Sequence, residues 1–365
     1  MSDKKLHGVE AVNEEYQQYD QVERPHAYHL AEHAAEDQFD DETEIKTCDL
    51  SQLLHGGVAG QERFAEDLGS AMKEIGFAIL VGHGVDTSLH DTATEKVIEF
   101  FTTATREQKM RYRAERHGSV NQGYFPIKET SDIHPDLVEG WVFCRRAFDM
   151  PQHRVAPFEE TDYWPLAGYE PFFRQIVLAH ERLILPLTQS IFRYLGVDPH
   201  HYDERLTQTN FGLRLNYYPP ISREDDESGA GRLLGHEDID LFTILPAPRV
   251  EGLQALNRQN GKWVRVQAPP GSIILNTGDY MQRVTNDVLP STTHRVSKPR
   301  DGTAHEEPRV SVPMAVYVWE DELLEVLPGL PEPTYPPIKA INFHTKTTAK
   351  FYGDEYAVDG DSEAS

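Results

Sequence analysis

Two histidines and an aspartate carry the strongest chemical signal in this sequence. His236 and Asp238 are two residues apart in a segment with strand character, and side chains at i and i+2 of a strand lie on the same face. A third candidate, His294, is separated from Asp238 by 55 residues, a stretch long enough to wind round a β-barrel and return opposite the first pair. Two imidazoles and one carboxylate are the ligands used by non-haem Fe(II) oxygenases. Either motif alone occurs often by chance, so the prediction of an iron site rests on all three residues.

A second pair of polar residues, Arg309 and Ser311, has the spacing of a carboxylate clamp. Both fall on one face of a predicted strand. A guanidinium binds a carboxylate through two parallel hydrogen bonds, and a neighbouring hydroxyl adds a third. The distal carboxylate of a five-carbon 2-oxo diacid needs such a clamp while its 2-oxo acid end chelates a metal. The alternative for any single arginine is a surface ion pair.

Polar and apolar side chains alternate along the segment 211–218. Arg214, Asn216 and Tyr218 share one face, and Leu213, Leu215 and Tyr217 share the other. Polar donors and an arginine are costly in a packed core, but they are useful inside a ligand-binding barrel. Arg214 indicates an anionic group on the substrate, although it can equally pair with one of the many acidic side chains. The predicted substrate pocket contains Arg214, Phe125, Tyr124 and Phe242.

The elements that must position these residues differ between the two halves of the chain. Apolar residues at helical spacing predict helices over 64–75, around 97–101 and over 171–195, and 77–81 predicts a short buried strand. After Gly196, short strands separated by Gly and Pro turns predict a sandwich or barrel. The predicted strands are 211–218, 239–245, 252–256, 262–267, 272–276, 291–296 and 308–318.

Four parts are expected along the chain. Residues 1–44 are polar and acidic, and we expect a mobile extension with a short helix near 28–35. Residues 45–205 form the helical N-terminal region, and 206–345 form the β-barrel. Residues 346–365 are expected to be a polar C-terminal tail.

Composition limits the partners and the cellular compartment. There are 60 Asp and Glu residues against 35 Lys and Arg, a formal net charge of −25. Such a charge repels phosphate backbones and anionic membranes, so we expect no nucleic-acid or membrane partner. The only cysteines, Cys48 and Cys144, have no CxxC spacing, which argues against a disulfide scaffold or a Cys-rich zinc site. With no secretory signal and no apolar run of about 20 residues, we expect a cytoplasmic protein whose oligomeric state the sequence does not determine.

A series of short motifs follows a fixed order between about residues 45 and 320. They are Gly76-Phe77, Gly82-His83-Gly84-Val85, Asn216-Tyr217-Tyr218-Pro219, His236-Glu237-Asp238 through Thr243, Gly252-Leu253-Gln254, Asn276-Thr277-Gly278-Asp279, Thr285-Asn286, Ser291 through Val296, and Arg309-Val310-Ser311. In this order they resemble the isopenicillin N synthase-like family of Fe(II) oxygenases. Each motif alone is weak, but the ordered combination is specific.

The resemblance implies a mainly β fold with α-helices: a double-stranded β-helix, or jelly roll, core with a helical N-terminal layer. It assigns the two histidines and the aspartate to Fe(II). It assigns Arg309 and Ser311 to the distal carboxylate of 2-oxoglutarate, with Asn216 and Tyr218 as supporting contacts, and it makes His83 structural. The implied activity is a dioxygenase that uses O₂ and couples decarboxylation of 2-oxoglutarate to hydroxylation of a small molecule. Desaturation or cyclisation uses the same oxidant.

Two other functions stay open at this point. The His-Glu-Asp triplet at 236–238 is also similar to isopenicillin N synthase itself, an oxidase that needs no 2-oxoglutarate; Arg309 and Ser311 then bind the substrate. A non-catalytic barrel that binds a small molecule is the other alternative, since fold alone does not give function. One departure from the family pattern is the 14 residues between His294 and Arg309, which predict a longer hairpin turn.

Overall fold

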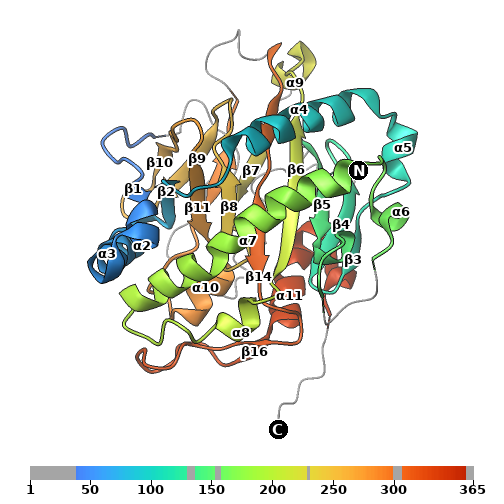
Figure 1. Ribbon diagram of the computed structural model, residues 1–365. Coiled ribbons are helices and arrows are strands. Elements are labelled where there is room, and N and C mark those ends of the chain that lie inside the picture. Colours follow the sequence, from blue (N-terminus) through green and yellow to red (C-terminus); the bar gives the residue numbers. More distant parts are fainter. Residues whose placement is uncertain (1–37, 130–135, 153–157, 228–230, 299–305, 359–365) are drawn as a thin grey trace.

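The computed structural model describes residues 38–129, 136–152, 158–227, 231–298 and 306–358. In these residues a ten-stranded sheet and a four-stranded sheet form the core, and a two-stranded ribbon lies near the C-terminal end. Helices cover the large sheet (Figure 1). The helix expected near 28–35 and most of the longer turn before Arg309 lie outside the described residues.

The large sheet is antiparallel except where its first two strands pair in parallel. Strand β13, Arg309–Ser311, pairs with one end of β6 beside the main path. In spatial order the other strands are β1 Thr47–Asp49, β2 Phe77–Val81, β11 Ile273–Thr277, β8 Phe242–Pro246, β14 Met314–Tyr317, β6 Asn210–Tyr218, β5 Glu139–Cys144, β4 Val120–Phe125 and β3 Glu115–His117.

The small sheet is antiparallel and carries both histidines of the predicted iron site. Its strands, in spatial order, are β10 Lys262–Arg265, β9 Leu253–Asn257, β12 His294–Val296 and β7 Leu233–His236. The ribbon consists of β15 Leu323–Leu324 and β16 Ile338–Lys339.

Two of the long helices have one end that the sequence caps. Helix α3, Gly57–Ile75, ends at Gly76, whose φ of +71° is the left-handed conformation that favours glycine at a helix C-terminus. Helix α4, Thr87–Thr103, begins where the Asp86 carboxylate accepts the Ser88 N–H. The remaining helices are α2 Ser51–His55, α5 Arg106–Met110, α6 Glu160–Tyr163, α7 Tyr169–Tyr194, α8 Asp203–Leu206, α9 Arg223–Glu227, α10 Asp279–Val284 and α11 Ala340–Tyr352, with 3₁₀ turns at Arg145–Ala147 and Asp354–Tyr356.

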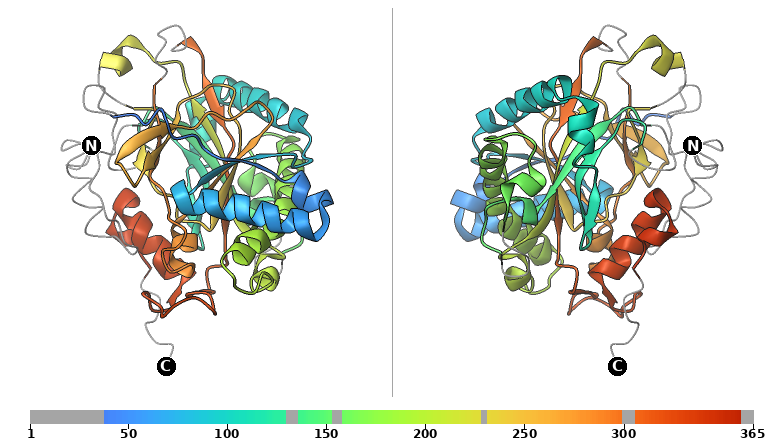
Figure 2. Two further views of the ribbon diagram at one scale, coloured as in Figure 1. Left: turned by 90° about the vertical axis from the view of Figure 1, so that its left-hand side faces the viewer. Right: turned by 90° about the vertical axis from the view of Figure 1, so that its right-hand side faces the viewer.

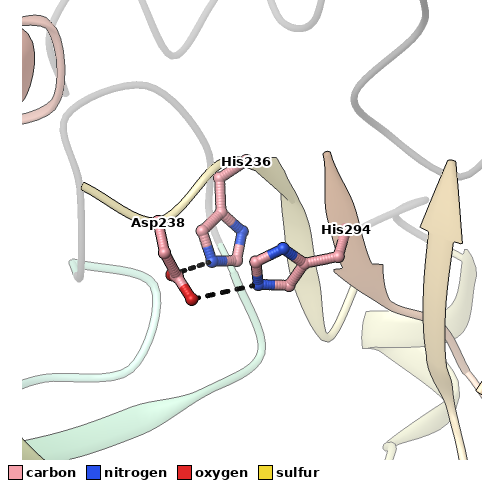
Figure 3. Close-up of side chains that lie close together, drawn as sticks. All are labelled: His236, Asp238 and His294. Carbon is pink, nitrogen blue, oxygen red and sulfur yellow. Dashed lines mark ion pairs between the residues drawn. The ribbon is translucent and has the colours of Figure 1, made fainter. Parts of the chain in front are cut away.

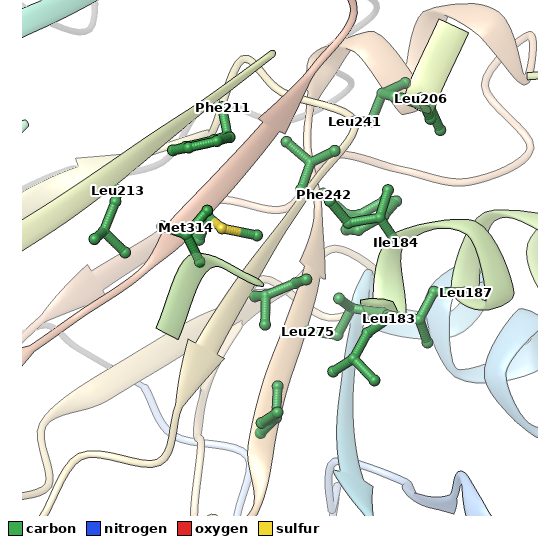
Figure 4. Close-up of a cluster of buried hydrophobic side chains, with 14 of the residues drawn as sticks. Leu183, Ile184, Leu187, Leu206, Phe211, Leu213, Leu241, Phe242, Leu275 and Met314 are labelled. Atoms are coloured by element: carbon green, nitrogen blue, oxygen red, sulfur yellow. The ribbon is translucent and has the colours of Figure 1, made fainter. Parts of the chain in front are cut away.

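The main hydrophobic core lies between α7 and the large sheet. Figure 4 shows Leu183, Ile184 and Leu187 of α7 facing side chains of the sheet, including Leu213 and Met314. Each such buried side chain stabilises the fold by roughly 1.5–3 kcal/mol. In the side views α7 and α11 lie on opposite sides of the large sheet (Figure 2). The second side therefore remains available for the small sheet and α11 to enclose a cavity.

Three sequence predictions need correction. The predicted strand 239–245 begins only at Phe242, because 237–241 form a loop that bonds to the start of α10. The predicted boundary between 345 and 346 falls inside α11, which is packed against the barrel. The extension predicted to end at 44 is attached from Phe39 onward, where it bridges to Trp263. In both terminal regions a polar composition conceals specific tertiary contacts.

Candidate active site

The two histidines and the aspartate meet at one edge of the small sheet. His236 is the last residue of β7 and His294 the first of β12, and the two are paired across the strands. Asp238 lies in the loop after β7, so the three side chains converge although only the histidines are on strands (Figure 3). The three ligand atoms all lie within 4.8 Å of one another. His236 Nε2 is 3.7 Å from Asp238 Oδ1, and His294 Nε2 is 3.8 Å from Asp238 Oδ2.

Backbone carbonyls fix the tautomer of both histidines. Nδ1 of His236 lies 2.9 Å from the carbonyl oxygen of Leu234, and Nδ1 of His294 lies 3.0 Å from that of Thr292. A carbonyl can only accept, so each Nδ1 carries the hydrogen and each Nε2 presents a lone pair to the centre. Burial, followed by the neighbouring His294, lowers the pKa of His236 to about 4, so this imidazole is neutral at pH 7. Two imidazoles that each present Nε2, together with a carboxylate, fit Fe(II).

A short hydrogen-bond chain orients the carboxylate of Asp238. Its Oδ2 accepts from Asn276 Nδ2 at 2.8 Å and from Thr243 Oγ1 at 2.9 Å. Thr243 Oγ1 is also 2.6 Å from Asp240 Oδ2, yet a hydroxyl has only one hydrogen. Burial and the nearby charge of Asp238 raise the pKa of Asp240 well above its ordinary value. We infer that the protonated Asp240 donates to Thr243, which in turn donates to Asp238.

Ionisation of Asp238 itself is favoured by the same surroundings. Burial alone opposes the charged form, but the two histidines and the bonds from Asn276 and Thr243 outweigh it. The pKa of Asp238 therefore lies below its ordinary value, and the group is a carboxylate at neutral pH. Fixed donors of this kind hold a metal ligand in place before the metal arrives.

The predicted clamp for a dicarboxylate is built where β13 pairs with β6. Arg309 is opposite Tyr218 and Ser311 opposite Asn216. Arg309 is 1% exposed; its Nε donates to the Val250 carbonyl at 3.1 Å, and its guanidinium carbon lies 5.0 Å from the centre of the Tyr218 ring. Its Nη1 is buried and has no hydrogen-bond partner among the described residues. A buried charged donor without a partner is costly, so this site fits a carboxylate.

One cavity of about 230 Å³ contains the three ligands and the clamp. Alternate residues of β6, namely Gly212, Arg214, Asn216 and Tyr218, all line it, as the alternation predicted. The opposite wall comes from the small sheet, and α11 contributes one side. The cavity is slightly smaller than the usual ligand pocket of about 300–1,000 Å³. It therefore favours small ligands.

Comparisons with known proteins decide the family. Residues 209–316 match the 2OG-Fe(II) oxygenase superfamily, and residues 45–167 match the family model described as non-haem dioxygenase in morphine synthesis N-terminal. This chain belongs to the 2OG-Fe(II) oxygenase superfamily. It is an Fe(II)- and 2-oxoglutarate-dependent dioxygenase that acts on a small molecule.

Individual relatives agree with this dioxygenase assignment. The 2-oxoglutarate-Fe(II) type oxidoreductase ppzC of Metarhizium majus is 29% identical over 278 residues, 69% of this chain and 73% of the relative. The proline hydroxylase buaE of Petromyces alliaceus is 28% identical over 266 residues, 72% of this chain and 83% of the relative. T7H of Neurospora crassa, solved in complex with alpha-KG, has a TM-score of 0.71 at 22% identity, covering 84% of this chain and 96% of T7H. This structural likeness confirms the expected jelly-roll fold with N-terminal helices.

The structure brings most of the predicted site residues of the dioxygenase together, with two exceptions. Phe125 and Arg214 line the cavity, but Tyr124 and Phe242 do not. Tyr124 precedes Phe125 on β4 and faces the other way, where its hydroxyl donates to Glu139 at 2.6 Å. Phe242 is fully buried in the core beneath α7. Neither residue contacts the cavity, so their predicted role in substrate binding is wrong.

His83 lies outside the cavity lining, as the structural role implied by the resemblance requires. Its Nε2 is 2.8 Å from the Gly271 carbonyl, and its Nδ1 accepts the Val85 N–H.

Among the described helices, none combines the length and apolar composition needed to span a lipid bilayer.

Sequence reasoning missed one wall of the cavity. His344, Thr348 and Tyr352 of α11 line it, together with Tyr317 of β14 and Asn121 of β4. The three helical residues are spaced at i, i+4 and i+8, which places them on one face of an α-helix. That spacing is a readable signal, but it was hidden in a segment interpreted as a polar tail.

Proposed function

We propose that this dioxygenase hydroxylates a small organic molecule in the cavity between the two sheets, with iron held by His236, Asp238 and His294. The observation that carries the assignment is the convergence of three ligand atoms within 4.8 Å, each histidine presenting its Nε2. Arg309 and Ser311 bind the distal carboxylate of 2-oxoglutarate. Asn216 supports the clamp through its amide, which donates to Ser311 Oγ at 3.4 Å, and Tyr218 supports it by packing on Arg309.

The residues of the chain bind, orient and shield the reactants. When bound, iron supplies the activation of O₂, coupled to oxidative decarboxylation of 2-oxoglutarate to succinate and CO₂. Leu245, Leu253 and Val296 form an apolar part of the lining of the cavity that contains the clamp, and apolar surroundings strengthen a bond between guanidinium and carboxylate. The unpartnered Nη1 of Arg309 fits a carboxylate ligand, and the family match supports 2-oxoglutarate as the molecule that supplies it.

The test is anaerobic titration of the Fe(II)-loaded protein with 2-oxoglutarate, following the weak visible charge-transfer band of a metal-chelated 2-oxo acid. The wild-type protein and Arg193→Met, which alters an exposed arginine of α7, should both develop the band. Arg309→Met should need at least tenfold more 2-oxoglutarate, because it loses a charged hydrogen-bond donor. His236→Ala should bind no iron. Iron binding without a band in the wild-type protein would refute the use of 2-oxoglutarate, and unchanged iron content in His236→Ala would refute the ligand set.

We propose a cytoplasmic location on separate grounds. Cys48 and Cys144 are unpaired and buried, and burial raises the pKa of Cys48 to about 12 and that of Cys144 to about 11. Both are therefore inert thiols that need no oxidising compartment. Cell fractionation of the native host tests this, and recovery of the protein outside the cytoplasm would contradict it.

A further inference from the structure

Arg214 is a second guanidinium in the same cavity. Asp136, Glu237 and Asp238 also line this cavity, but none of them forms an ion pair with Arg214. It lies on the cavity face of β6, where its backbone N–H donates to the Pro313 carbonyl at 2.8 Å. Its Nε is buried with no hydrogen-bond partner, and no carboxylate among the described residues forms an ion pair with it. Its guanidinium carbon lies 5.7 Å from the centre of the Phe125 ring.

The co-substrate does not account for Arg214. Arg309 of β13 lies opposite Tyr218 of β6 in the sheet, and Arg214 lies four residues before Tyr218 on β6. Four residues of strand span about 13 Å, so the two guanidiniums serve different parts of the cavity. 2-Oxoglutarate has two carboxylates, one for the metal and one for Arg309. A third anionic group is therefore needed for Arg214, and the primary substrate is the remaining molecule in the cavity.

The side chains around Arg214 limit the charge and character of that substrate. Among the lining residues, Arg214 and Arg309 are the only arginines or lysines, and burial lowers the pKa of the nearby His344 to about 3, so this histidine is neutral. One free positive charge matches a monoanion better than a phosphate dianion, which usually recruits several donors or cations. The residues that adjoin Arg214 include the apolar Phe125, Val142 and Pro313.

The wall formed by α11 is held firmly on the same side of the cavity. The Tyr356 hydroxyl donates to Asn121 Oδ1, and Arg116 Nη1 donates to the Tyr356 carbonyl at 2.9 Å. The Tyr352 ring lies 6.1 Å from that of Phe125, centre to centre. The two hydrogen bonds tie the 3₁₀ turn after α11 to β4 and β3, and the ring contact joins α11 itself to β4, so Tyr352 and Phe125 form an aromatic wall of the cavity.

We propose that the primary substrate is a small carboxylic acid with an apolar body, and that Arg214 binds its carboxylate. The proposal rests on the proposed function, since it takes this cavity as the active site. The carboxylate pairs with Arg214, and the apolar body packs against the wall formed by Phe125 and Tyr352, with its reacting carbon toward the three metal ligands. A cavity of about 230 Å³, shared with 2-oxoglutarate, restricts the enclosed part to a small body.

Calorimetric titration with matched acids and amides tests the proposal. The probes are phenylacetate and hexanoate, each compared with its neutral amide, on anaerobic protein saturated with Fe(II) and 2-oxoglutarate so that Arg309 is already occupied. In the wild-type protein and in Arg193→Met, the acids should bind at least tenfold more tightly than the amides, because the amides lose a charge-assisted bond. In Arg214→Met this ratio should fall to about one. Arg214→Lys should give an intermediate ratio, and Arg214→Gln replaces the Met variant if that one does not fold.

The outcomes separate this proposal from the proposed function. No acid binding in the millimolar range, equal affinity for acids and amides in the wild-type protein, or a preference that survives in Arg214→Met would each overturn the substrate class. The charge-transfer band with 2-oxoglutarate should persist in the Arg214 variants. A band without any preference for acids refutes only the role of Arg214, whereas iron binding without a band in the wild-type protein refutes the proposed function itself.

Discussion

Gly278, which joins β11 to α10, is where one added methyl group should disturb the iron site most directly. Its φ of −112° and ψ of −177° are extended values that any residue adopts, so the constraint is space and not conformation. A Cβ atom at this position would lie 2.2 Å from Asp240 Oδ1, 2.5 Å from the Asp240 carbonyl oxygen and 2.8 Å from the Asp238 carbonyl oxygen. Real Cβ atoms essentially never come within 3.0 Å of such neighbours. Gly278→Ala therefore requires the loop that carries Asp238 to move.

The size of the effect follows from what holds this loop. The contact to the Asp240 carbonyl must open from 2.5 Å to beyond 3.0 Å. The same two carbonyls accept the first N–H groups of α10, from Asp279 at 2.8 Å and from Tyr280 at 3.1 Å, so the loop cannot retreat without stretching these bonds. Overpacking of this kind costs about 1–3 kcal/mol of unfolding free energy. A shift of about 0.5 Å is also the tolerance of a preorganised site, and we expect Fe(II) affinity to fall about 10- to 100-fold.

The assay combines urea unfolding with anaerobic Fe(II) titration. Gly231→Ala is the matched control, because its Cβ would have no neighbour within 4 Å and its φ is not positive. The control should change the unfolding free energy by no more than about 0.5 kcal/mol and leave iron affinity unchanged. Wild-type stability together with wild-type iron affinity in Gly278→Ala would refute the argument that this loop has no room.

Three further predictions address the clamp, the hydrogen-bond chain and the pH dependence of stability. Arg309→Lys keeps the positive charge but cannot donate two parallel hydrogen bonds to one carboxylate, so titration of the charge-transfer band should show at least tenfold weaker 2-oxoglutarate binding. Unchanged affinity would count against the clamp. In Asp240→Asn the new amide can still donate a hydrogen bond to Thr243, so the unfolding free energy should stay close to that of the wild-type protein. In Asp240→Ala the unfolding free energy should fall by about 1–3 kcal/mol. Equal losses of the two variants in urea unfolding would contradict a protonated Asp240 that donates to Thr243. Burial, then the neighbouring His90, lowers the pKa of His180 from 6.5 to about 3. Between these two pH values the unfolded chain therefore binds more protons than the folded one, and the unfolding free energy falls as the pH drops below 6.5. Urea unfolding at pH 7 and pH 5 should show a smaller fall in His180→Leu than in the wild-type protein. An equal fall would contradict the lowered pKa of His180.

The sequence predicted the parts of the site that depend on spacing along one strand. On β6 the alternation of polar and apolar residues gave the correct faces, because one side meets the cavity and the other meets the core. Arg309 and Ser311 share a face on β13 for the same reason. Strand β2 occurs as predicted, at Phe77–Val81. These predictions succeeded because the periodicity itself carried the information.

The failures have two physical origins: strands that are buried on both faces, and a loop that is held by contacts distant in the sequence. Strand β8 is buried at all five residues, so its pattern does not show that Phe242 faces α7. On β4, two adjacent aromatic residues cannot both face the cavity, and nothing in the sequence says which one does. Asp238 converges on the histidines from a loop, a position set by the bonds between 238–241 and α10. Such contacts join residues about 40 positions apart and leave no local pattern.

The distance between the metal and the clamp is the feature that no motif could supply. Both histidines belong to the small sheet, whereas Arg309 and Ser311 belong to the large sheet. Their separation is therefore set by how the two sheets pack, and not by the geometry of any one strand. Because β6 carries both Arg214 and the residues opposite the clamp, the two anion-binding positions move together if the large sheet shifts. Mutations in the core beneath β8 and β14 should accordingly affect co-substrate and substrate binding in parallel, while leaving the small sheet's histidine pair intact.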